Sequence, residues 1–289
     1  MSHRKNHHFV PQFYFRRFSI DGRSICLLQR NSGRTIAQAS IKAQASKNWF
    51  YGTGNIEDAL GEIEGACSAA LNALAAIRNP IDLDGDNIQL ILAWLSLQRS
   101  RTEAARQASQ PMHDRLLRLH LEVELNNDKE MPEEQKEELR KTLDQVSGNP
   151  VPLQGIEMKV SLEGAHLLAD LAPVLLENRT NRPFIFGDAP VVYYNGYYRD
   201  VKLRGVLGKT TPGLMVLFPL TPTLGLMLFD AEAYEAKRIQ KGRIFVRELS
   251  DVMAINKLQL HAASSCVYFH DFKFAGYVHA LWLQEHANL

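Results

Sequence analysis

The sequence is poor in cysteine, and this scarcity argues against two classes of small protein. The chain has three cysteines in 289 residues. Cys26, Cys67 and Cys266 lie far apart, and no two of them form a Cys-x-x-Cys pair. Neither a disulfide framework nor a cysteine-ligated zinc site is therefore indicated. We expect three reduced cysteines, buried as small apolar side chains.

Long hydrophobic runs are also missing. The longest apolar stretch, residues 214–229, is interrupted by Pro219, Thr221, Pro222 and Gly225. It falls short of the roughly 20 apolar residues that a membrane-spanning helix needs. The first residues lead into a basic and aromatic stretch without the apolar core of a signal peptide. We therefore expect a cytoplasmic protein with no membrane partner.

The chain has almost no net charge, but its charges are unevenly distributed. The formal net charge is +1, so the chain as a whole gives no argument for binding nucleic acid. Residues 1–48 carry nine basic and one acidic side chain, whereas residues 49–150 carry ten basic and eighteen acidic ones. A basic segment of this kind can bind nucleic acid. Because the two excesses match in size, we favour pairing between the two segments of the same chain.

Several familiar catalytic motifs are absent. The sequence contains no His-Glu-x-x-His and no Gly-x-Ser-x-Gly. Gly208-Lys209-Thr210 resembles the end of a phosphate-binding loop, but the first glycine of that loop is missing at its required spacing. Any functional site therefore has to be sought in individual residues.

The first half of the chain predicts a hairpin followed by helices. Two strand-like runs, residues 24–29 and 35–40, flank a turn that contains Asn31 and Gly33. From Asn55 onward, apolar residues recur every three or four positions, which predicts an amphipathic helix. Further helices are predicted over four ranges: from 84 or 86 to 109, 111–126, 132–146 and 162–178.

The second half is richer in strand-forming residues. Strands are predicted over residues 183–187, 191–195, 214–218, 224–229 and 266–270, with a short helix capped by Asp230 and a long one over 246–264. We predict an α+β fold with an N-terminal basic and aromatic arm and hairpin, a central helical bundle, and a C-terminal mixed sheet with flanking helices. The whole chain, residues 1–289, is expected to form one domain with possible sub-lobes at 1–54, 55–148 and 153–289.

The N-terminal arm is the most unusual segment. Residues 7–18 read His-His-Phe-Val-Pro-Gln-Phe-Tyr-Phe-Arg-Arg-Phe. In a strand His7 and His8 would point to opposite sides, so that only one of them could enter a given site. We favour an aromatic arm buried against the helices. The alternative is an exposed arm that binds nucleic acid, a nucleotide or a partner surface through stacking and through Gln12, Arg16 and Arg17.

The arm resembles the start of a bacterial and fungal family called domain of unknown function 4238. That family opens with His-x-Val-Pro and a Tyr-Leu pair, and here Phe15 stands where Leu is usual. The resemblance continues in order along nearly the whole chain, at residues 48–51, 98–102, 184–192, 219–222 and 256–259. Gly187 and Ala189 replace the family's Ser and Asn. The resemblance implies one family domain and does not assign an activity.

Three further groups of polar residues are candidates for a site. Gln98 and Arg101 share one helix face and Arg99 points elsewhere. They form either an internal ion-pair network, in which Asp188 or Glu64 would be the partner, or an anion clamp. Asp188 lies in a Gly-Asp-x-Pro connection, where it either accepts backbone N–H groups or acts as a rigid functional carboxylate. Glu64 lies seven residues, or about two helical turns, after Glu57. Both are either ordinary solvated helix acids or flank one pocket over Gly61.

Two functions follow as hypotheses. The first is a binding module for nucleic acid, a nucleotide or a partner, which uses His7, Gln12, Arg16, Arg17, Gln98 and Arg99. The second is a metal-dependent hydrolase of the phosphodiesterase or nuclease type. In that case His7, His8, Glu64 and Asp188 would hold a divalent metal, and the catalytic residues would be His8, Asp188 and Arg101.

Overall fold

The computed structural model confirms the predicted α+β fold. It describes residues 5–54, 56–77, 79–201, 204–235 and 239–287. The helices are α1 (Gln12–Arg16), α2 (Ile56–Ala76), α3 (Gly85–Ser100), α4 (Glu103–Asn127), α5 (Glu133–Leu143), α6 (Pro150–Glu163), α7 (Leu249–Ala262) and α8 (Ala275–His286). The strands are β1 (Asn6–His8), β2 (Ser24–Gln29), β3 (Thr35–Ser40), β4 (Ser46–Asn48), β5 (Ala172–Asn178), β6 (Phe186–Gly187), β7 (Val192–Asn195), β8 (Leu214–Thr221), β9 (Leu224–Phe229), β10 (Arg243–Val246) and β11 (Cys266–Phe269).

The strands form two main sheets and one small ribbon. The larger sheet has the order β10-β5-β9-β8-β7 and is mixed, because β10 runs parallel to β5 while the other pairs are antiparallel. The second sheet has the order β3-β2-β11-β6 and is antiparallel. Its register pairs Leu27 with Tyr268, so the N-terminal hairpin and a C-terminal strand belong to one sheet. The ribbon pairs β1 with β4.

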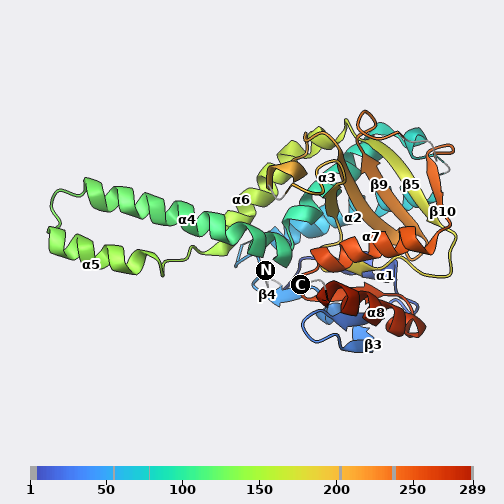
Figure 1. Ribbon diagram of the computed structural model, residues 1–289, viewed down its shortest axis with the longest axis horizontal. Helices are drawn as coiled ribbons and strands as arrows, with labels where there is room; N and C mark the ends of the chain where they lie inside the picture. Colours follow the sequence, from blue (N-terminus) through green and yellow to red (C-terminus); the bar gives the residue numbers. More distant parts are fainter. Residues whose placement is uncertain (1–4, 55, 78, 202–203, 236–238, 288–289) are drawn as a thin grey trace.

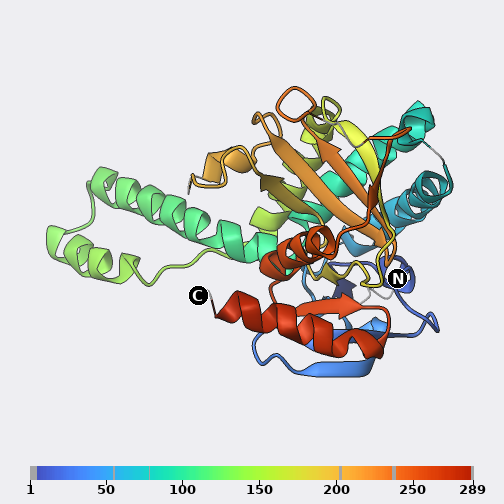
Figure 2. The ribbon, with the colours of Figure 1, turned by 45° about the vertical axis from the view of Figure 1, so that its right-hand side comes forward.

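Helices cover both faces of the larger sheet. Leu226 and Leu228 of β9 belong to a core cluster with α2 and α3, whereas the intervening Met227 packs in the cluster that contains Val252 of α7. α8 packs on the second sheet, where Val278 meets Leu28 of β2. The α4–α5 hairpin projects away from the sheets (Figure 1), and it does so again in the rotated view (Figure 2). No helix of the described residues is long and apolar enough to cross a membrane.

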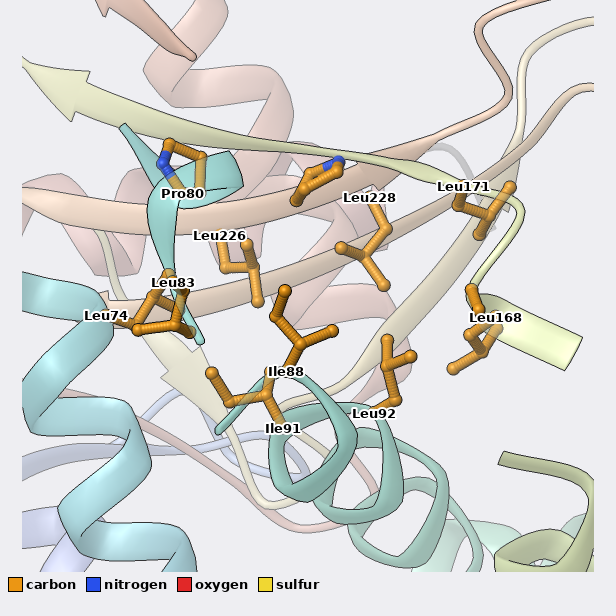
Figure 3. A pocket seen from close by; sticks show the side chains of 12 residues that line it. Leu74, Pro80, Leu83, Ile88, Ile91, Leu92, Leu168, Leu171, Leu226 and Leu228 are labelled. Carbon is orange, nitrogen blue, oxygen red and sulfur yellow. The ribbon is translucent and has the colours of Figure 1, made fainter. Parts of the chain in front are cut away.

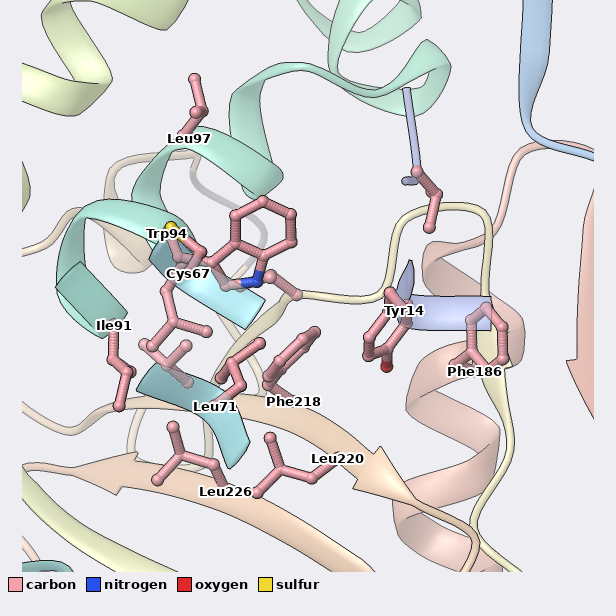
Figure 4. Close-up of a cluster of buried hydrophobic side chains, with 14 of the residues drawn as sticks. Tyr14, Cys67, Leu71, Ile91, Trp94, Leu97, Phe186, Phe218, Leu220 and Leu226 are labelled. Atoms are coloured by element: carbon pink, nitrogen blue, oxygen red, sulfur yellow. The ribbon is translucent and has the colours of Figure 1, made fainter. Parts of the chain in front are cut away.

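The aromatic arm is a central part of the core. Tyr14 is fully buried and lies between Phe186 and Phe218 (Figure 4). The centroid of its ring lies 4.9 Å from that of Phe186 and 4.9 Å from that of Phe218. The Tyr14 hydroxyl donates a hydrogen bond of 2.5 Å to the carbonyl of Pro219. α1 therefore joins β6 of the second sheet to β8 of the larger one. The core cluster around it contains residues from all three predicted sub-lobes.

Most predicted elements are present, but the boundary between the second and third helices was placed wrongly. A helix to Ser109 with a new one from Pro111 was expected, whereas α3 ends at Ser100 and Pro111 lies inside α4. The break occurs because Thr102 adopts an extended conformation, with φ −85° and ψ 162°. Its hydroxyl accepts a hydrogen bond from the N–H of Ala105 and so caps α4. Asn55, where the first helix was predicted to begin, lies outside the described residues.

The helix predicted over residues 162–178 is also wrong. α6 ends at Glu163, and Ala172–Asn178 form β5, which pairs with β9 and β10. Val174, Leu175 and Leu176 are buried on both faces of the sheet, so this run has no alternation to distinguish it from a helix. Where a short helix after Asp230 was predicted, the described residues 231–233 form a turn, because the Asp230 carboxylate binds the N–H groups of residues 232 and 233. α8 and β10 were not predicted.

Candidate functional site

Several predicted site residues meet around Arg101, the residue that follows α3. We call this group the Arg101 cluster and define it as His7, His8, Tyr51, Glu57, Glu64, Gln98 and Arg101. The side chain of Arg101 is fully buried. Its Nη2 donates to the carbonyl of His8 at 2.6 Å and to Glu64 Oε1 at 2.9 Å. Its Nε donates to the Tyr51 hydroxyl at 3.2 Å. The guanidinium thus connects the arm, the segment after β4, and α2.

The two histidines of the cluster point to different sides, as the strand period predicts. His7 is 2% exposed, and its Nδ1 accepts a hydrogen bond of 3.1 Å from the N–H of Tyr51. The rings of His7 and Tyr51 are stacked with their centroids 5.8 Å apart. His8 is half-buried, and its Nε2 lies 3.1 Å from the carbonyl of Lys42. Only His7 therefore faces the interior.

The helix α2 supplies two carboxylates to the cluster. Glu57 Oε1 accepts a hydrogen bond of 3.3 Å from the N–H of His8, while Glu64 binds Arg101 two turns later. Gly61 lies between them on the same face, because four residues make about one helical turn. A Cβ added at Gly61 would meet no atom within 4 Å. The surface between the two glutamates is therefore open at Gly61.

Burial shapes the electrostatics of the cluster. It raises the pKa of Glu57, since the charged carboxylate loses solvent, although the N–H of His8 and the charge of Arg101 act against this. Burial would lower the pKa of Arg101, but Tyr51 and Glu64 raise it by more, so the guanidinium stays charged. Burial also raises the pKa of Tyr51. The cluster thus combines a charged guanidinium with a carboxyl group whose pKa lies above its usual value.

Three buried polar atoms of the cluster have no hydrogen-bond partner among the described residues. They are Nη1 of Arg101, Oε1 of Gln98 and Oε2 of Glu57. The other ends of these side chains are occupied, since Gln98 Nε2 donates to the carbonyl of Phe9 at 2.9 Å. An unsatisfied buried polar group costs about 1–3 kcal/mol, and all three atoms belong to side chains of the Arg101 cluster.

Two further predicted residues lie at the rim of the cluster. Gln12 Nε2 is 3.4 Å from His8 Nε2, and Gln12 Oε1 accepts a hydrogen bond of 3.2 Å from Arg16. Arg16 is exposed. Lys47 of β4 forms an ion pair of 2.9 Å with Glu103, which gives one contact of the kind expected between the basic and acidic segments.

Arg17 and Arg99 have structural contacts elsewhere. Arg17 donates to the carbonyl of Leu220 at 3.0 Å and to Asn72 Oδ1 at 2.5 Å. Arg99 lies over the ring of Tyr193, with its Cζ 4.7 Å from the ring centroid. Burial lowers the pKa of both arginines. Each side chain therefore attaches a helix to the larger sheet or its edge.

Asp188 has a structural role of its own. Its carboxylate is buried and accepts hydrogen bonds from the N–H groups of Ser264 (2.7 Å), Ser265 (2.8 Å) and Cys266 (3.2 Å) and from the Ser264 hydroxyl (3.0 Å). Burial raises the pKa of Asp188, and these hydrogen bonds act against the increase. The expected capping of N–H groups is thus observed, but the groups belong to a distant connection between α7 and β11.

The four predicted metal ligands are not gathered at one point. His7, His8 and Glu64 belong to the Arg101 cluster, whereas both oxygens of Asp188 are occupied by the segment that begins at Ser264. Among the residues that the structure describes, no group of three or more His, Cys, Asp or Glu side chains is placed to hold a metal ion.

Four of the five aromatic residues of the arm are too deeply buried to stack on bases. Phe9, Tyr14, Phe15 and Phe18 are 4%, 0%, 0% and 1% exposed. The interpretation of the arm as exposed and stacking on bases is therefore wrong. The interpretation that we favoured, a buried aromatic arm, is confirmed. Any binding by this region has to use its polar residues.

Tyr51 is the main cluster residue that the sequence did not single out. Its hydroxyl donates to the carbonyl of Arg101 at 3.1 Å and accepts from Arg101 Nε, so it holds the end of α3 in place. The signal was present, because Tyr51 ends one of the segments that carry the family resemblance. Arg106 was missed as well; its Nε donates to Gln154 Oε1 at 2.8 Å and its Cζ lies 3.6 Å from the centroid of the Phe50 ring.

A separate apolar cavity of about 230 Å³ lies between α3 and the larger sheet (Figure 3). All its lining residues are apolar: Leu74, Pro80, Leu83, Ile88, Ile91, Leu92, Leu168, Ala169, Leu171, Pro173, Leu226 and Leu228. The lining offers no acid, base or nucleophile. The Arg101 cluster is therefore the better candidate for a site that recognises a polar ligand.

Comparison with known proteins bears out the family resemblance. A family model described as "Protein of unknown function (DUF4238)" matches residues 6–273, nearly the whole chain. No curated protein and no solved structure gives a significant match. The matched range contains every residue of the Arg101 cluster. The chain therefore belongs to the DUF4238 family of proteins of unknown function.

Proposed function

We propose that the Arg101 cluster binds a small ligand with an anionic group, of the nucleotide or phosphate class. The observation that carries this proposal is the unpartnered Nη1 of a fully buried, charged arginine. A guanidinium donor suits phosphate oxygens because its planar fork matches their geometry. Gln98 Oε1 and a protonated Glu57 would complete the contacts as an acceptor and a donor.

The surroundings of the cluster favour an anion. Lys5, Arg16, Lys42 and Lys47 are all exposed and lie in or beside the segments that form the rim. The carbonyl of Lys42 contacts His8, and Lys47 is the β-sheet partner of His7. A basic rim raises the local concentration of anions and speeds their approach.

The open surface at Gly61 is the proposed route to Arg101. Glu57 is half-buried, and its contact with the N–H of His8 is long at 3.3 Å. The proposal requires Glu57 to rotate away from the N–H of His8, so that the ligand can pass Gly61 and reach Nη1. Because burial raises the pKa of Glu57, protonation at lower pH removes its repulsion of an anion. Affinity should therefore increase as the pH falls through the pKa of Glu57.

Calorimetric titration of the full chain with ATP, GTP and inorganic phosphate tests the proposal. We expect binding of at least one of these probes to the wild type and a loss of about tenfold or more in Arg101→Lys, which keeps the charge but loses the fork. Arg99→Lys is the matched control, because Arg99 is half-buried but lies over Tyr193.

A second pair of variants avoids the internal contacts of Arg101. Gly61→Leu should block the open surface of α2, whereas Gly276→Leu changes an equally open glycine in α8. Selective loss of binding in Gly61→Leu supports the proposed route. Absence of binding by the wild type, or equal binding by Gly61→Leu and wild type, would contradict it.

A further inference from the structure

The helix α4 carries an apolar stripe on the hairpin that projects from the body of the molecule (Figures 1 and 2). The stripe consists of Met112, Leu116, Leu119 and Val123, which are 51%, 56%, 49% and 53% exposed. We call these four residues the α4 stripe. Their spacings of four, three and four residues are those of the seam of a coiled coil. Contiguous exposed apolar side chains of this kind mark a surface that another protein covers.

The opposite side of α4 is covered by the chain itself. Asp114 Oδ1 accepts a hydrogen bond of 2.9 Å from the N–H of Gly148, and Arg118 Nε donates to the carbonyl of Val146 at 3.0 Å. Leu117 lies beside the same connection. At 100° per residue these positions lie roughly opposite the α4 stripe. The hairpin therefore uses one side of α4 internally and leaves the stripe to an external partner.

We propose that this partner is a second copy of the chain, bound through an antiparallel pairing of the two α4 helices. The spacings along the stripe, four, three and four residues, are the same in either chain direction. A two-fold axis between Leu116 and Leu119 therefore places Met112 against Val123 of the second copy and Leu116 against Leu119 of the second copy. A patch that is complementary to itself in this way produces a closed dimer.

Charges beside the stripe agree with the antiparallel orientation. Arg115 and Glu122 are exposed and lie seven residues apart, so they occupy the same flank of the stripe. Reversal of the second helix places Arg115 opposite Glu122 of the other copy, and symmetry repeats the pair. Opposite charges at such flanking positions set the orientation of paired helices.

The interface is small. The stripe runs over eleven residue steps, or about 16 Å of helix. Interfaces of this size are typical of weak or reversible association, so we expect dissociation in roughly the micromolar range. Sedimentation velocity of the full chain at increasing concentration should show its mass rise from 32.7 kDa toward twice that value.

Substitutions separate the stripe from other exposed leucines. Leu116→Lys should keep the chain monomeric over the same concentrations. Leu139→Lys is the control, since Leu139 is 42% exposed on α5 and lies outside the stripe. Arg115→Glu should weaken the dimer, and the double variant Arg115→Glu/Glu122→Arg should restore it. A wild type that stays monomeric, or a Leu116→Lys variant that dimerises as well as the wild type, would overturn the proposal.

Cysteine cross-linking decides the orientation. Met112→Cys and Val123→Cys, each alone, should not form a covalent dimer, because the antiparallel pairing keeps like positions about 16 Å apart. An oxidised mixture of the two variants should form one. Wild type is the control for the native Cys26, Cys67 and Cys266. Covalent dimers of each variant alone, with none specific to the mixture, would show a parallel pair and refute the antiparallel arrangement.

Discussion

The substitution Asp188→Asn should destabilise the fold strongly, because a buried carboxylate there accepts four hydrogen bonds. The four hydrogen bonds are divided unequally between the two carboxylate oxygens. Oδ1 accepts one from an N–H group, and Oδ2 accepts two from N–H groups and one from a hydroxyl. An asparagine replaces one acceptor with an NH2 group that faces a donor. At least one hydrogen bond to a charged acceptor is lost, and a buried N–H is left unpaired. These effects predict a decrease of about 2–4 kcal/mol in the free energy of unfolding.

Urea denaturation followed by circular dichroism measures this effect. Asp21→Asn is the matched control, because Asp21 also accepts hydrogen bonds from two backbone N–H groups, at 2.8 and 2.7 Å, and from neighbouring hydroxyls, but lies at the surface. Solvent can replace its lost contacts, so we expect a clearly smaller loss of stability. If Asp188→Asn unfolds at the same urea concentration as the wild type, the carboxylate does not hold the connection before β11, and our account of Asp188 is incorrect.

Two further predictions concern Glu57 and the apolar cavity. The raised pKa of Glu57 means that its stabilising effect is complete below the unfolded value near 4.5 and is lost as the pH rises through the folded pKa. Glu57→Gln should therefore flatten the pH dependence of unfolding above this value, and parallel curves for variant and wild type would refute the assignment. Ala169→Leu, at the mouth of the cavity, should raise the free energy of unfolding by up to about 1 kcal/mol in thermal denaturation. A lower melting temperature would show that the cavity does not accept the added carbons.

The elements that the sequence predicted well are those with a clear local pattern. The apolar spacing from Ile56 to Leu74 gave α2, and the turn at Asn31 and Gly33 gave the hairpin of β2 and β3. β5 was assigned to a helix because Val174, Leu175 and Leu176 are all buried in the sheet. Its identity as a strand depends on pairing with β9 and β10, which local pattern does not reveal.

The part of the candidate site that follows from a local pattern was also predictable. Gln98 and Arg101 share a helix face, and this correctly indicated two buried polar side chains that need partners. The pair formed by Arg101 and Glu64 was one of the two partners that we considered, and the structure contains it. Asp188 could not be placed, because its contacts with the segment from Ser264 depend on the pairing of β6 with β11.

The most direct test of the central proposal is a crystal structure of the chain soaked in phosphate or in a nucleotide that binds in the titration. We predict an anion oxygen within hydrogen-bond distance of Arg101 Nη1, with Glu57 rotated away from the N–H of His8. Density for water alone beside Nη1, with the anion bound elsewhere or absent, would contradict the proposal and leave Arg101 as a purely structural residue.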